Sequence, residues 1–384
     1  MSTRTPEEIS ASRERFVKCF LFEKTDHPPH HETLGFWPQA LERWKAEGFP
    51  AGMSGEEYFD MDGYSWTPGM GSATQLPIYP KFEETVLDDL PDYLVVRTTN
   101  GIVEKRYKHS RSMPQFLEFP IKNRAGWEEI KSRLDPRESE RYAEIERDAA
   151  ETNARRNVPT NREILPFIVC GAYGFPRNLF GEERLAYLYY DDPELIHEIM
   201  ATWLEFYCIY ADKISALLDL DYVFLWEDMA FKNGPLISPA MVDEFMMPYY
   251  RDLISHLKRL GYNLFQLDTD GDARLILDLF ADAGVNSFGP CEIAAGVEPL
   301  PLRKKYGRRM SLAGGIDKRE LAKGKEAIYE EVMRKVPELL AHGGYAPGVD
   351  HAVPSDVAFE DYCYFVELVR RLGREISPDL TAPI

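Results

Sequence analysis

From Ile164 onward the chain repeats one unit, a short apolar run followed by a helical pattern, and this repeat constrains the fold more than any other feature. The four steps from Tyr222 to Tyr345 average about 31 residues each, which is the length of a β-strand, a helix and their loops. Strands that alternate with helices in this way are parallel. The six predicted strands are residues 167–170, 222–226, 264–267, 285–288, 310–313 and 345–349.

The predicted fold class is α/β, as a (β/α)8 TIM-type barrel with an N-terminal extension. Six parallel strands, with one or two more from the first third of the chain, are enough to close such a barrel. An open doubly wound sheet is the alternative, but the sequence has no G-x-G-x-x-G fingerprint that would support a dinucleotide site. We expect residues 1–160 to form the extension and early barrel elements, and residues 161–384 to form the main barrel portion of one integrated domain.

The extension carries two helical patterns and one hairpin signal. Asn100 and Gly101 separate two apolar runs, and an Asn-Gly pair supplies the two positive φ angles of a type I′ turn. This pattern predicts a β-hairpin with strands at 94–99 and 102–107. The helices are predicted at residues 6–20 and 38–47.

The charge balance excludes several classes of partner. The chain has 45 Lys and Arg against 64 Asp and Glu, a formal net charge of −19, and such a surface repels phosphate backbones and anionic lipids. No apolar run approaches the roughly 20 residues that a membrane span needs. The five cysteines form no CxxC pair, which is typical of reduced thiols. We therefore expect a cytoplasmic protein that binds a small-molecule substrate, and neither nucleic acid nor a membrane.

Acidic residues follow five of the six predicted strands, where the loops of a barrel meet at one face and carry its chemistry. Several carboxylates directed at one cavity are tolerated mainly when a cation, a shared proton or a basic group offsets their repulsion. This interpretation makes Glu227, Asp228 and Asp270 candidate catalytic groups.

Other side chains near the strand ends are candidates for binding. Asp268, Cys291 and His351 offer the ligand types that zinc accepts, although Cys291 is also typical of a small core residue. His27, His30 and His31 flank two prolines and are predicted to lie in a solvated surface turn. The candidate substrate-binding residues are Tyr173, Phe175, Arg177, Trp226, Lys232, Asn233 and Asp317, of which Asp317 has a helix N-cap as its alternative role.

Five of these strand-end segments resemble the uroporphyrinogen decarboxylase superfamily, which includes the corrinoid-dependent methyltransferases. The resemblance implies a distorted (β/α)8 barrel, in agreement with the repeat. It also extends weakly to Gly35-Phe36-Trp37. The five segments are Gly174-Phe175-Pro176-Arg177, Glu227-Asp228-Met229-Ala230, residues 267–272, residues 314–317 and residues 350–357.

Two branches of the superfamily fit the sequence poorly. The Arg-Gln-Ala-Gly-Arg-Tyr segment of true uroporphyrinogen decarboxylases does not occur in this chain, and a site rich in carboxylates would repel an eight-fold acidic substrate. The thiol-directed methyltransferases bind zinc through His-x-Cys and a further Cys, and Gln266, Asp268 and His351 stand at the matching positions. Thiolate activation is thereby put in doubt, although an oxygen and nitrogen set still suits zinc as a Lewis acid.

The remaining branch resembles the component that takes a methyl group from a methoxylated substrate and passes it to a corrinoid protein. Because a Co(I) corrinoid is a strong nucleophile, such an enzyme must chiefly help the oxygen to leave. A zinc ion held by Asp268, His351, Gln266 and Cys291 could do so, and so could protonation by Glu227, Asp228 or Asp270. The chain has no Asp-x-His-x-x-Gly corrinoid-binding motif, so the corrinoid would arrive on a partner or bind only through the barrel mouth.

Two alternatives stay open at the level of sequence. The chain could be a decarboxylase or lyase, with Asp270 or Asp228 as proton donor and with Arg177 and Lys232 holding a substrate carboxylate. It could also be a non-catalytic carrier that binds a corrinoid or a tetrapyrrole.

Overall fold

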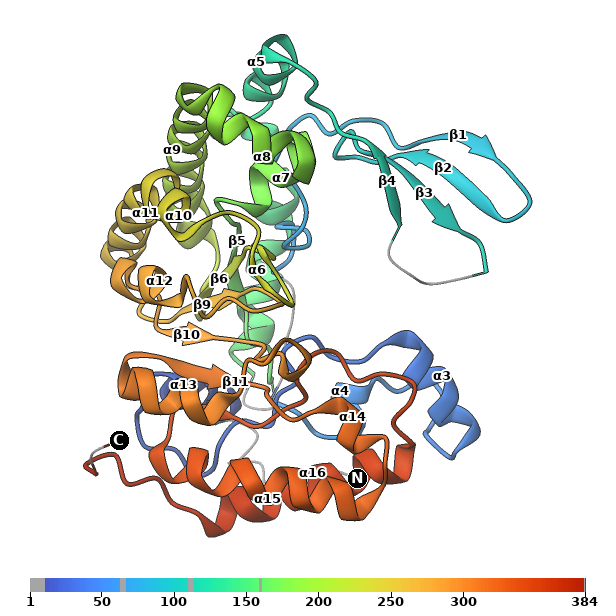
Figure 1. The fold of residues 1–384 in the computed structure, drawn as a ribbon, viewed down its shortest axis with the longest axis vertical. Coiled ribbons are helices and arrows are strands. Elements are labelled where there is room, and N and C mark those ends of the chain that lie inside the picture. Colours follow the sequence, from blue (N-terminus) through green and yellow to red (C-terminus); the bar gives the residue numbers. More distant parts are fainter. Residues whose placement is uncertain (1–10, 63–66, 110–113, 159–160, 383) are drawn as a thin grey trace.

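A parallel sheet of six strands forms the wall around which the helices pack in the computed structural model, which describes residues 11–62, 67–109, 114–158, 161–382 and 384 (Figure 1). Every neighbouring pair of strands in this sheet is parallel. The strands are β5 (Pro166–Cys170), β6 (Tyr222–Trp226), β9 (Phe265–Asp268), β10 (Ser287–Phe288), β11 (Ser311–Ala313) and β12 (Tyr345–Ala346).

The order of the strands distinguishes the two predicted architectures. The sheet runs β12-β11-β10-β9-β6-β5, so each strand lies beside its predecessor in the chain. A doubly wound sheet reverses its direction at a switch point, whereas a (β/α) barrel does not. The prediction of an α/β fold of the barrel type is therefore confirmed. Each of the six apolar runs overlaps one of these strands.

Two of the helices between the strands begin at a capping side chain followed by a proline, a pattern that marks a helix start in the sequence. Asp192 accepts a hydrogen bond from the backbone of Leu195, and Ser238 accepts one from Met241, each before a proline at the start of a helix. Their bounds are α7 (Gly174–Phe180), α8 (Glu182–Asp191), α9 (Pro193–Leu217), α10 (Pro239–Phe245), α11 (Met247–Arg259), α12 (Leu277–Ala283), α13 (Pro299–Tyr306), α14 (Lys318–Leu321), α15 (Lys325–His342) and α16 (Phe359–Glu375), with the short pair β7 (Ala230–Phe231) and β8 (Gly234–Pro235) after β6.

The first third of the chain adds helices and a projecting sheet. The predicted helix at residues 6–20 is observed from Ser12, and its first residues, 6–10, lie outside the described part of the chain. The elements are α2 (Ser12–Phe20), α3 (Pro38–Ala46), α4 (Gly55–Tyr58), β1 (Thr85–Asp89), β2 (Tyr93–Arg97), β3 (Val103–Tyr107), β4 (Gln115–Glu118), α5 (Arg124–Ser132) and α6 (Ala143–Arg156).

Strands β1 to β4 form an antiparallel sheet that projects from the body, and we call it the arm (Figure 1). It contains the predicted hairpin, but the predicted type I′ turn is wrong. Only Gly101 has a positive φ, of 81°, while Gly101 N–H donates to Thr98 and Thr98 N–H donates to Ile102. This is a three-residue loop with a type I turn and a glycine bulge. The Asn100 side chain instead accepts a hydrogen bond from Leu76.

The segment before α3 lies along the chain that follows β12. Phe36 forms a parallel bridge with Val353, Trp37 N–H donates to the Val353 carbonyl at 3.0 Å, and Val353 N–H donates to Gly35 at 2.9 Å. This pairing brings Trp37 to the carboxyl ends of the barrel strands.

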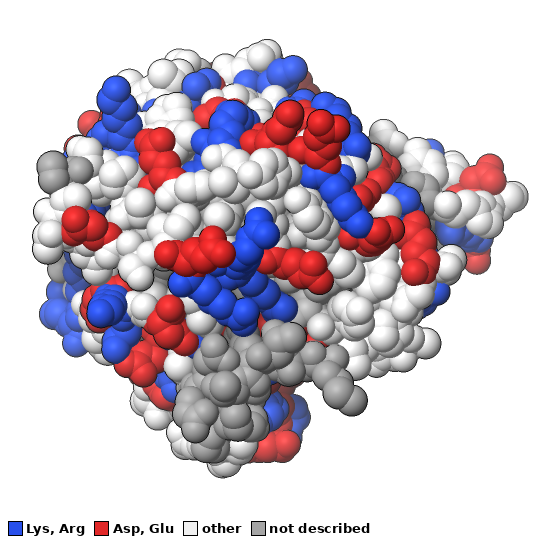
Figure 2. Space-filling view, turned by 90° about the horizontal axis from the view of Figure 1, so that it is seen from below, with Lys and Arg blue, Asp and Glu red and all other residues white. Residues whose placement is uncertain are grey.

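The surface carries both signs of charge. In the face shown in Figure 2, acidic and basic side chains are intermingled. Among the helices of the described residues, none is both long and apolar enough to cross a membrane.

Candidate active site

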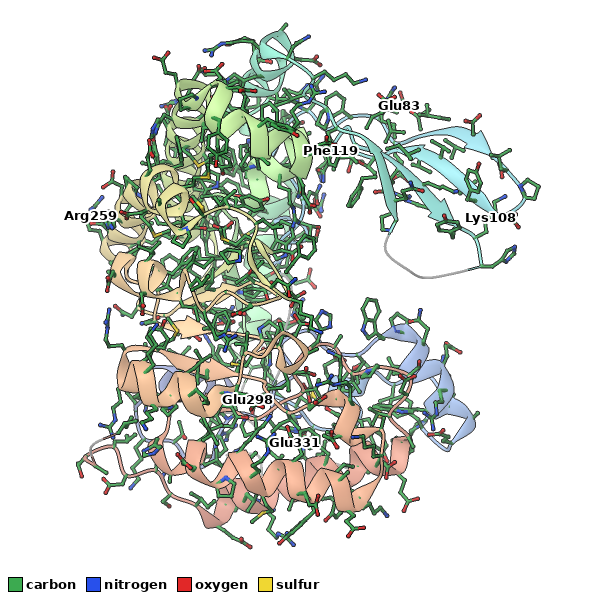
Figure 3. All side chains as sticks on the ribbon, viewed as in Figure 1. Glu83, Lys108, Phe119, Arg259, Glu298 and Glu331 are labelled. Carbon is green, nitrogen blue, oxygen red and sulfur yellow. The ribbon has the colours of Figure 1, made fainter. Side chains whose placement is uncertain are left out.

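A cavity of about 1060 Å³ opens at the carboxyl ends of the strands, between the barrel and the arm. Its volume is just above the usual range for ligand pockets, roughly 300–1,000 Å³. Phe119, at the junction of arm and barrel, is part of its wall (Figure 3). Three parts of the chain line it: Arg177, Trp226, Asp228, Asp268, Asp270 and His351 from the barrel, Phe36 and Trp37 from the N-terminal segment, and Thr98, Asn100, Ile102, Glu104, Arg106 and Phe116 from the arm.

Asp268 is the last residue of β9 and is buried at the wall of this cavity. Its Oδ1 atom has no hydrogen-bond partner. Burial, and then the charges of Asp270 and Asp228, raise the pKa of Asp268 well above its usual range. Asp268 therefore keeps a proton where an ordinary carboxyl group has lost it.

Asp270 and His351 contact each other in the cavity lining, with Nε2 of His351 3.3 Å from Oδ2 of Asp270. The backbone N–H of Ala352 donates to Nδ1 of His351 at 2.7 Å. Because Nδ1 accepts this bond, the proton of the neutral imidazole is on Nε2, on the side of Asp270. The Oδ1 atom of Asp270 has no partner and remains available.

Arg177 is already paired within the site. Its Nη1 donates to the backbone carbonyl of Asp228 at 2.5 Å and to Oδ2 of Asp228 at 2.9 Å. Its guanidinium lies 4.9 Å from the centre of the Trp226 ring. Asp228 has a φ of 46°, in the left-handed region that a residue with a Cβ rarely adopts. The pair fixes one wall of the cavity, with Asp228 as the anionic partner.

Glu227 takes a structural position, which corrects the expectation that it acts on substrate. It is fully buried and does not line the cavity. Its carboxylate accepts hydrogen bonds from the backbone N–H groups of Ala172, Tyr173 and Gly174 and from the hydroxyl of Tyr250. Burial raises the pKa of Glu227 to about 7, against these hydrogen bonds. Glu227 therefore fixes the loop between β5 and α7.

Most of the other predicted binding residues lie outside the cavity lining. Tyr173 and Phe175 are core residues, and Lys232 and Asn233 are exposed at the turn between β7 and β8. Asp317 is the N-cap of α14, where it accepts a hydrogen bond from Arg319 N–H at 2.9 Å. The alternative role of Asp317 as a helix cap is thus the one observed.

The predicted zinc ligands do not converge. Among the described residues, no three His, Cys, Asp or Glu side chains are grouped to hold a metal ion. Gln266 and Cys291 are buried outside the cavity lining, and burial raises the pKa of the Cys291 thiol to about 12. Both ring nitrogens of His351 already have neighbours. These side chains do not fit a zinc centre with three protein ligands, and zinc binding stays a prediction.

The histidines near the N-terminus correct another expectation. His30 and His31 are buried, not solvated, and burial lowers the pKa of His31 to about 4. The His31 ring packs against Phe16, and His30 N–H donates to Asp62, so tertiary contacts bury a segment that the local Pro-Pro pattern does not reveal.

The arm residues and Trp37 are the parts of the site that sequence reasoning missed. The weak resemblance at Gly35-Phe36-Trp37 was the one signal for Trp37. The hairpin was recognised, but no local pattern indicates that Asn100, Glu104 and Arg106 face the strand ends.

Comparison with known proteins places these observations in a family. Residues 178–372, just over half of the 384 residues, match the family model described as uroporphyrinogen decarboxylase (URO-D). The uroporphyrinogen decarboxylase of Pseudomonas fluorescens is 26% identical over 197 residues, which are 48% of this chain and 51% of that protein. That of Syntrophotalea carbinolica is 28% identical over 139 residues, 36% of this chain and 39% of that protein. The match thus spans about half, or less, of the length of these relatives.

A solved structure resembles nearly the whole chain. A methyltransferase from Methanosarcina mazei superposes with a TM-score of 0.62, covering 94% of this chain and 98% of that one, at 14% sequence identity. At this identity the likeness shows a shared fold.

Proposed function

The chain belongs to the uroporphyrinogen decarboxylase family, and from this premise we propose that it is an enzyme that takes a methyl group from a methoxylated small molecule and passes it to a corrinoid protein. The cavity at the strand ends is its active site. The likeness of the fold to a methyltransferase is consistent with this reaction class.

The observation that carries the proposal is the environment of Asp268. A buried carboxyl group with a raised pKa and an unpartnered oxygen is suited to donate a proton to a leaving oxygen. The negative charges of Asp270 and Asp228 keep that proton on Asp268 until it is needed.

In the proposed reaction the bond between the methyl carbon and the ether oxygen breaks, and its electron pair stays on the oxygen. The proton of Asp268 moves to that oxygen, so a neutral alcohol or phenol leaves. The electron pair for the new bond to the methyl carbon would come from a reduced corrinoid carried by the partner protein. No step requires a metal at the oxygen.

The rest of the cavity supports an uncharged or weakly charged, flat substrate. Phe36, Trp37, Phe116 and Trp226 offer ring faces. The acidic groups of the lining outnumber its two arginines, of which Arg177 is paired with Asp228 and Arg106 with Glu104. A polycarboxylate substrate would meet net negative charge.

The decarboxylase alternative is less well supported. It needs free cations to hold a substrate carboxylate, but Arg177 is engaged by Asp228 and Lys232 is exposed outside the cavity lining. No separate observation favours the carrier alternative.

One assay separates the three functions. The purified protein is incubated with a reduced corrinoid protein and a panel of methoxylated and carboxylated compounds, and the visible spectrum and carbon dioxide release are followed. Methylation of the corrinoid supports the proposal, and carbon dioxide without methylation would replace it with the decarboxylase. Stoichiometric corrinoid binding without turnover would indicate a carrier.

Zinc analysis of wild type and His351→Ala tests the zinc prediction. Equal zinc contents in the two proteins would reject His351 as a ligand.

A further inference from the structure

Three loops at the candidate active site are joined in a closed ring of contacts. Gly271 N–H donates to Oε2 of Glu292 at 2.7 Å, and Ile293 N–H donates to Oδ2 of Asp350 at 3.2 Å. Covalent bonds connect these contacts, because the residues involved are neighbours in the chain. Asp270 precedes Gly271, Glu292 precedes Ile293, and Asp350 precedes His351. The contact of 3.3 Å between Asp270 and His351 closes the ring.

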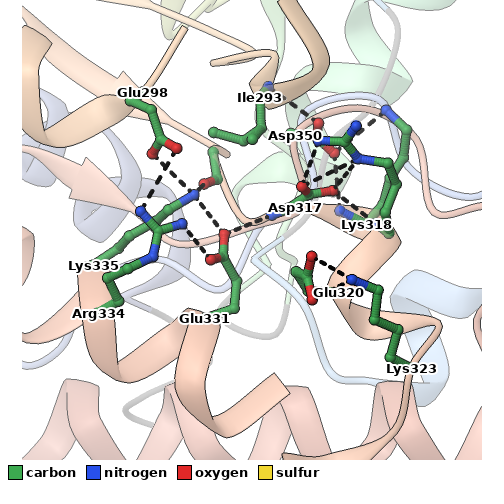
Figure 4. Close-up of polar contacts among 12 residues, drawn as sticks. Ile293, Glu298, Asp317, Lys318, Glu320, Lys323, Glu331, Arg334, Lys335 and Asp350 are labelled. Carbon is green, nitrogen blue, oxygen red and sulfur yellow. Dashed lines mark hydrogen bonds and ion pairs between the residues drawn. The ribbon is translucent and has the colours of Figure 1, made fainter. Parts of the chain in front are cut away.

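The Asp350 side of the ring is anchored in a buried polar network (Figure 4). Asp350 is fully buried, and its Oδ1 accepts from the backbone of Lys318 at 3.1 Å and lies 3.3 Å from Nζ of Lys318. A buried ion pair, Lys335 and Glu331, holds the loop between β11 and α14 that leads to Lys318. Nζ of Lys335 donates to the Gly315 carbonyl, and Glu331 accepts from Asp317 N–H. Such a network resists movement of Asp350 because each displaced group would lose a buried partner.

On the other side of the ring, Glu292 holds the loop after β9, whose backbone conformation at Gly271 is restricted. Gly271 has a φ of 78°, and a Cβ there would collide with the carbonyl oxygen of Ala230. Its N–H points to Glu292, and the next residue, Asp272, donates its N–H to Phe231 at 2.9 Å. The position of Asp270 is therefore set by the contacts of the residues that follow it.

We propose that Glu292 and Asp350 are positioning residues, which hold Asp270 and His351 at their observed separation for catalysis. Neither Glu292 nor Asp350 lines the cavity, so neither is placed to touch substrate. Each acts through the backbone: Glu292 through the loop of Asp270, and Asp350 through its own neighbour His351. The inference rests on the proposed function only in taking the cavity that Asp270 and His351 line as the place of methyl transfer.

The test compares Glu292→Ala with Glu292→Gln and with a control, Glu320→Ala. A glutamine keeps an oxygen that accepts from Gly271 N–H, whereas alanine does not. Glu320 pairs with Lys323 beside the network without joining the ring, so its replacement removes an ion pair alone (Figure 4). Asp350→Asn, which leaves one acceptor oxygen for the two backbone donors Ile293 and Lys318, is a second break in the ring.

Two readouts are used, and the first needs no substrate. In protein labelled with ¹⁵N-histidine, the His351 signal, assigned with His351→Gln, reports the proton on Nε2 and its exchange with water. Exchange is expected to accelerate at least tenfold in Glu292→Ala and Asp350→Asn, and to stay unchanged in Glu292→Gln and Glu320→Ala. Methyl transfer should fall about 10- to 100-fold in kcat, with less than a twofold change in KM, in the same two variants.

Unchanged exchange in folded Glu292→Ala and Asp350→Asn would overturn the positioning role. Equal loss in Glu292→Gln would also overturn it, because the acceptor would then be irrelevant. If wild type transfers no methyl group but the exchange pattern holds, the proposed function fails while the ring stands.

Discussion

Trp37 lies stacked on His351, with ring centroids 6.3 Å apart and planes 11° apart, although the two residues are near opposite ends of the chain. The indole is 38% exposed and lines the cavity, so its free face is open to a flat ligand. Replacing Trp37 with Leu should raise KM for an aromatic methyl ether about fivefold, because a stacking contact contributes ~1 kcal/mol. Steady-state kinetics measure this change.

Trp37→Phe is the matched control, since it keeps a smaller ring and should recover part of the affinity. A KM that is the same in all three proteins would show that substrate does not contact Trp37.

The pair of Arg177 and Asp228 should contribute to stability as a unit. The side chains are 14% and 38% exposed, so solvent screens the pair, and we expect a coupling free energy of about 1 kcal/mol. A double-mutant cycle with Arg177→Met and Asp228→Asn, followed by urea unfolding, measures this coupling. Strictly additive effects of the two substitutions would mean that the pair does not fix the cavity wall.

Glu32 should make the protein less stable as the pH rises. Its carboxyl group accepts hydrogen bonds from Val349 N–H and the Tyr362 hydroxyl, and burial raises its pKa from 4.5 to about 8. Between these values the folded state holds a proton that the unfolded state has lost. The free energy of unfolding therefore falls with pH across this window, by up to about 1.4 kcal/mol per pH unit.

Glu32→Gln removes this titration and keeps an acceptor oxygen for Val349 N–H, while its amide N–H can donate to the Tyr362 hydroxyl oxygen. Its free energy of unfolding should therefore fall less steeply between pH 5 and 8. Urea unfolding at several pH values compares the slopes, with Glu320→Gln as a half-exposed control. Parallel curves for wild type and Glu32→Gln would contradict a raised pKa at Glu32.

The barrel and its punctuation could be predicted because their signals are local. A strand, its helix and the caps at Asp192 and Ser238 each depend on residues a few positions apart. The turn at Asn100 was predicted wrongly because a distant backbone group, Leu76 N–H, binds the asparagine side chain.

The site could be predicted only in part, since local sequence does not say which way a side chain points. Glu227 and Asp228 are neighbours after one strand, yet one anchors the start of α7 and the other lines the cavity. Trp37 and the arm reach the site through tertiary contacts, and a single sequence does not encode these in any short pattern.

The central claim is that Asp268 protonates the leaving oxygen, and the dependence of methyl transfer on the leaving group tests it most directly. Asp268→Asn keeps the shape of the side chain but cannot donate that proton. Its single-turnover rate should fall about 100-fold or more for a methyl ether with a poor leaving group. For an ether whose phenol carries a nitro group, the rate should fall little, because that oxygen leaves without protonation. Equal losses for both ethers, or no loss for either, would contradict the role of Asp268.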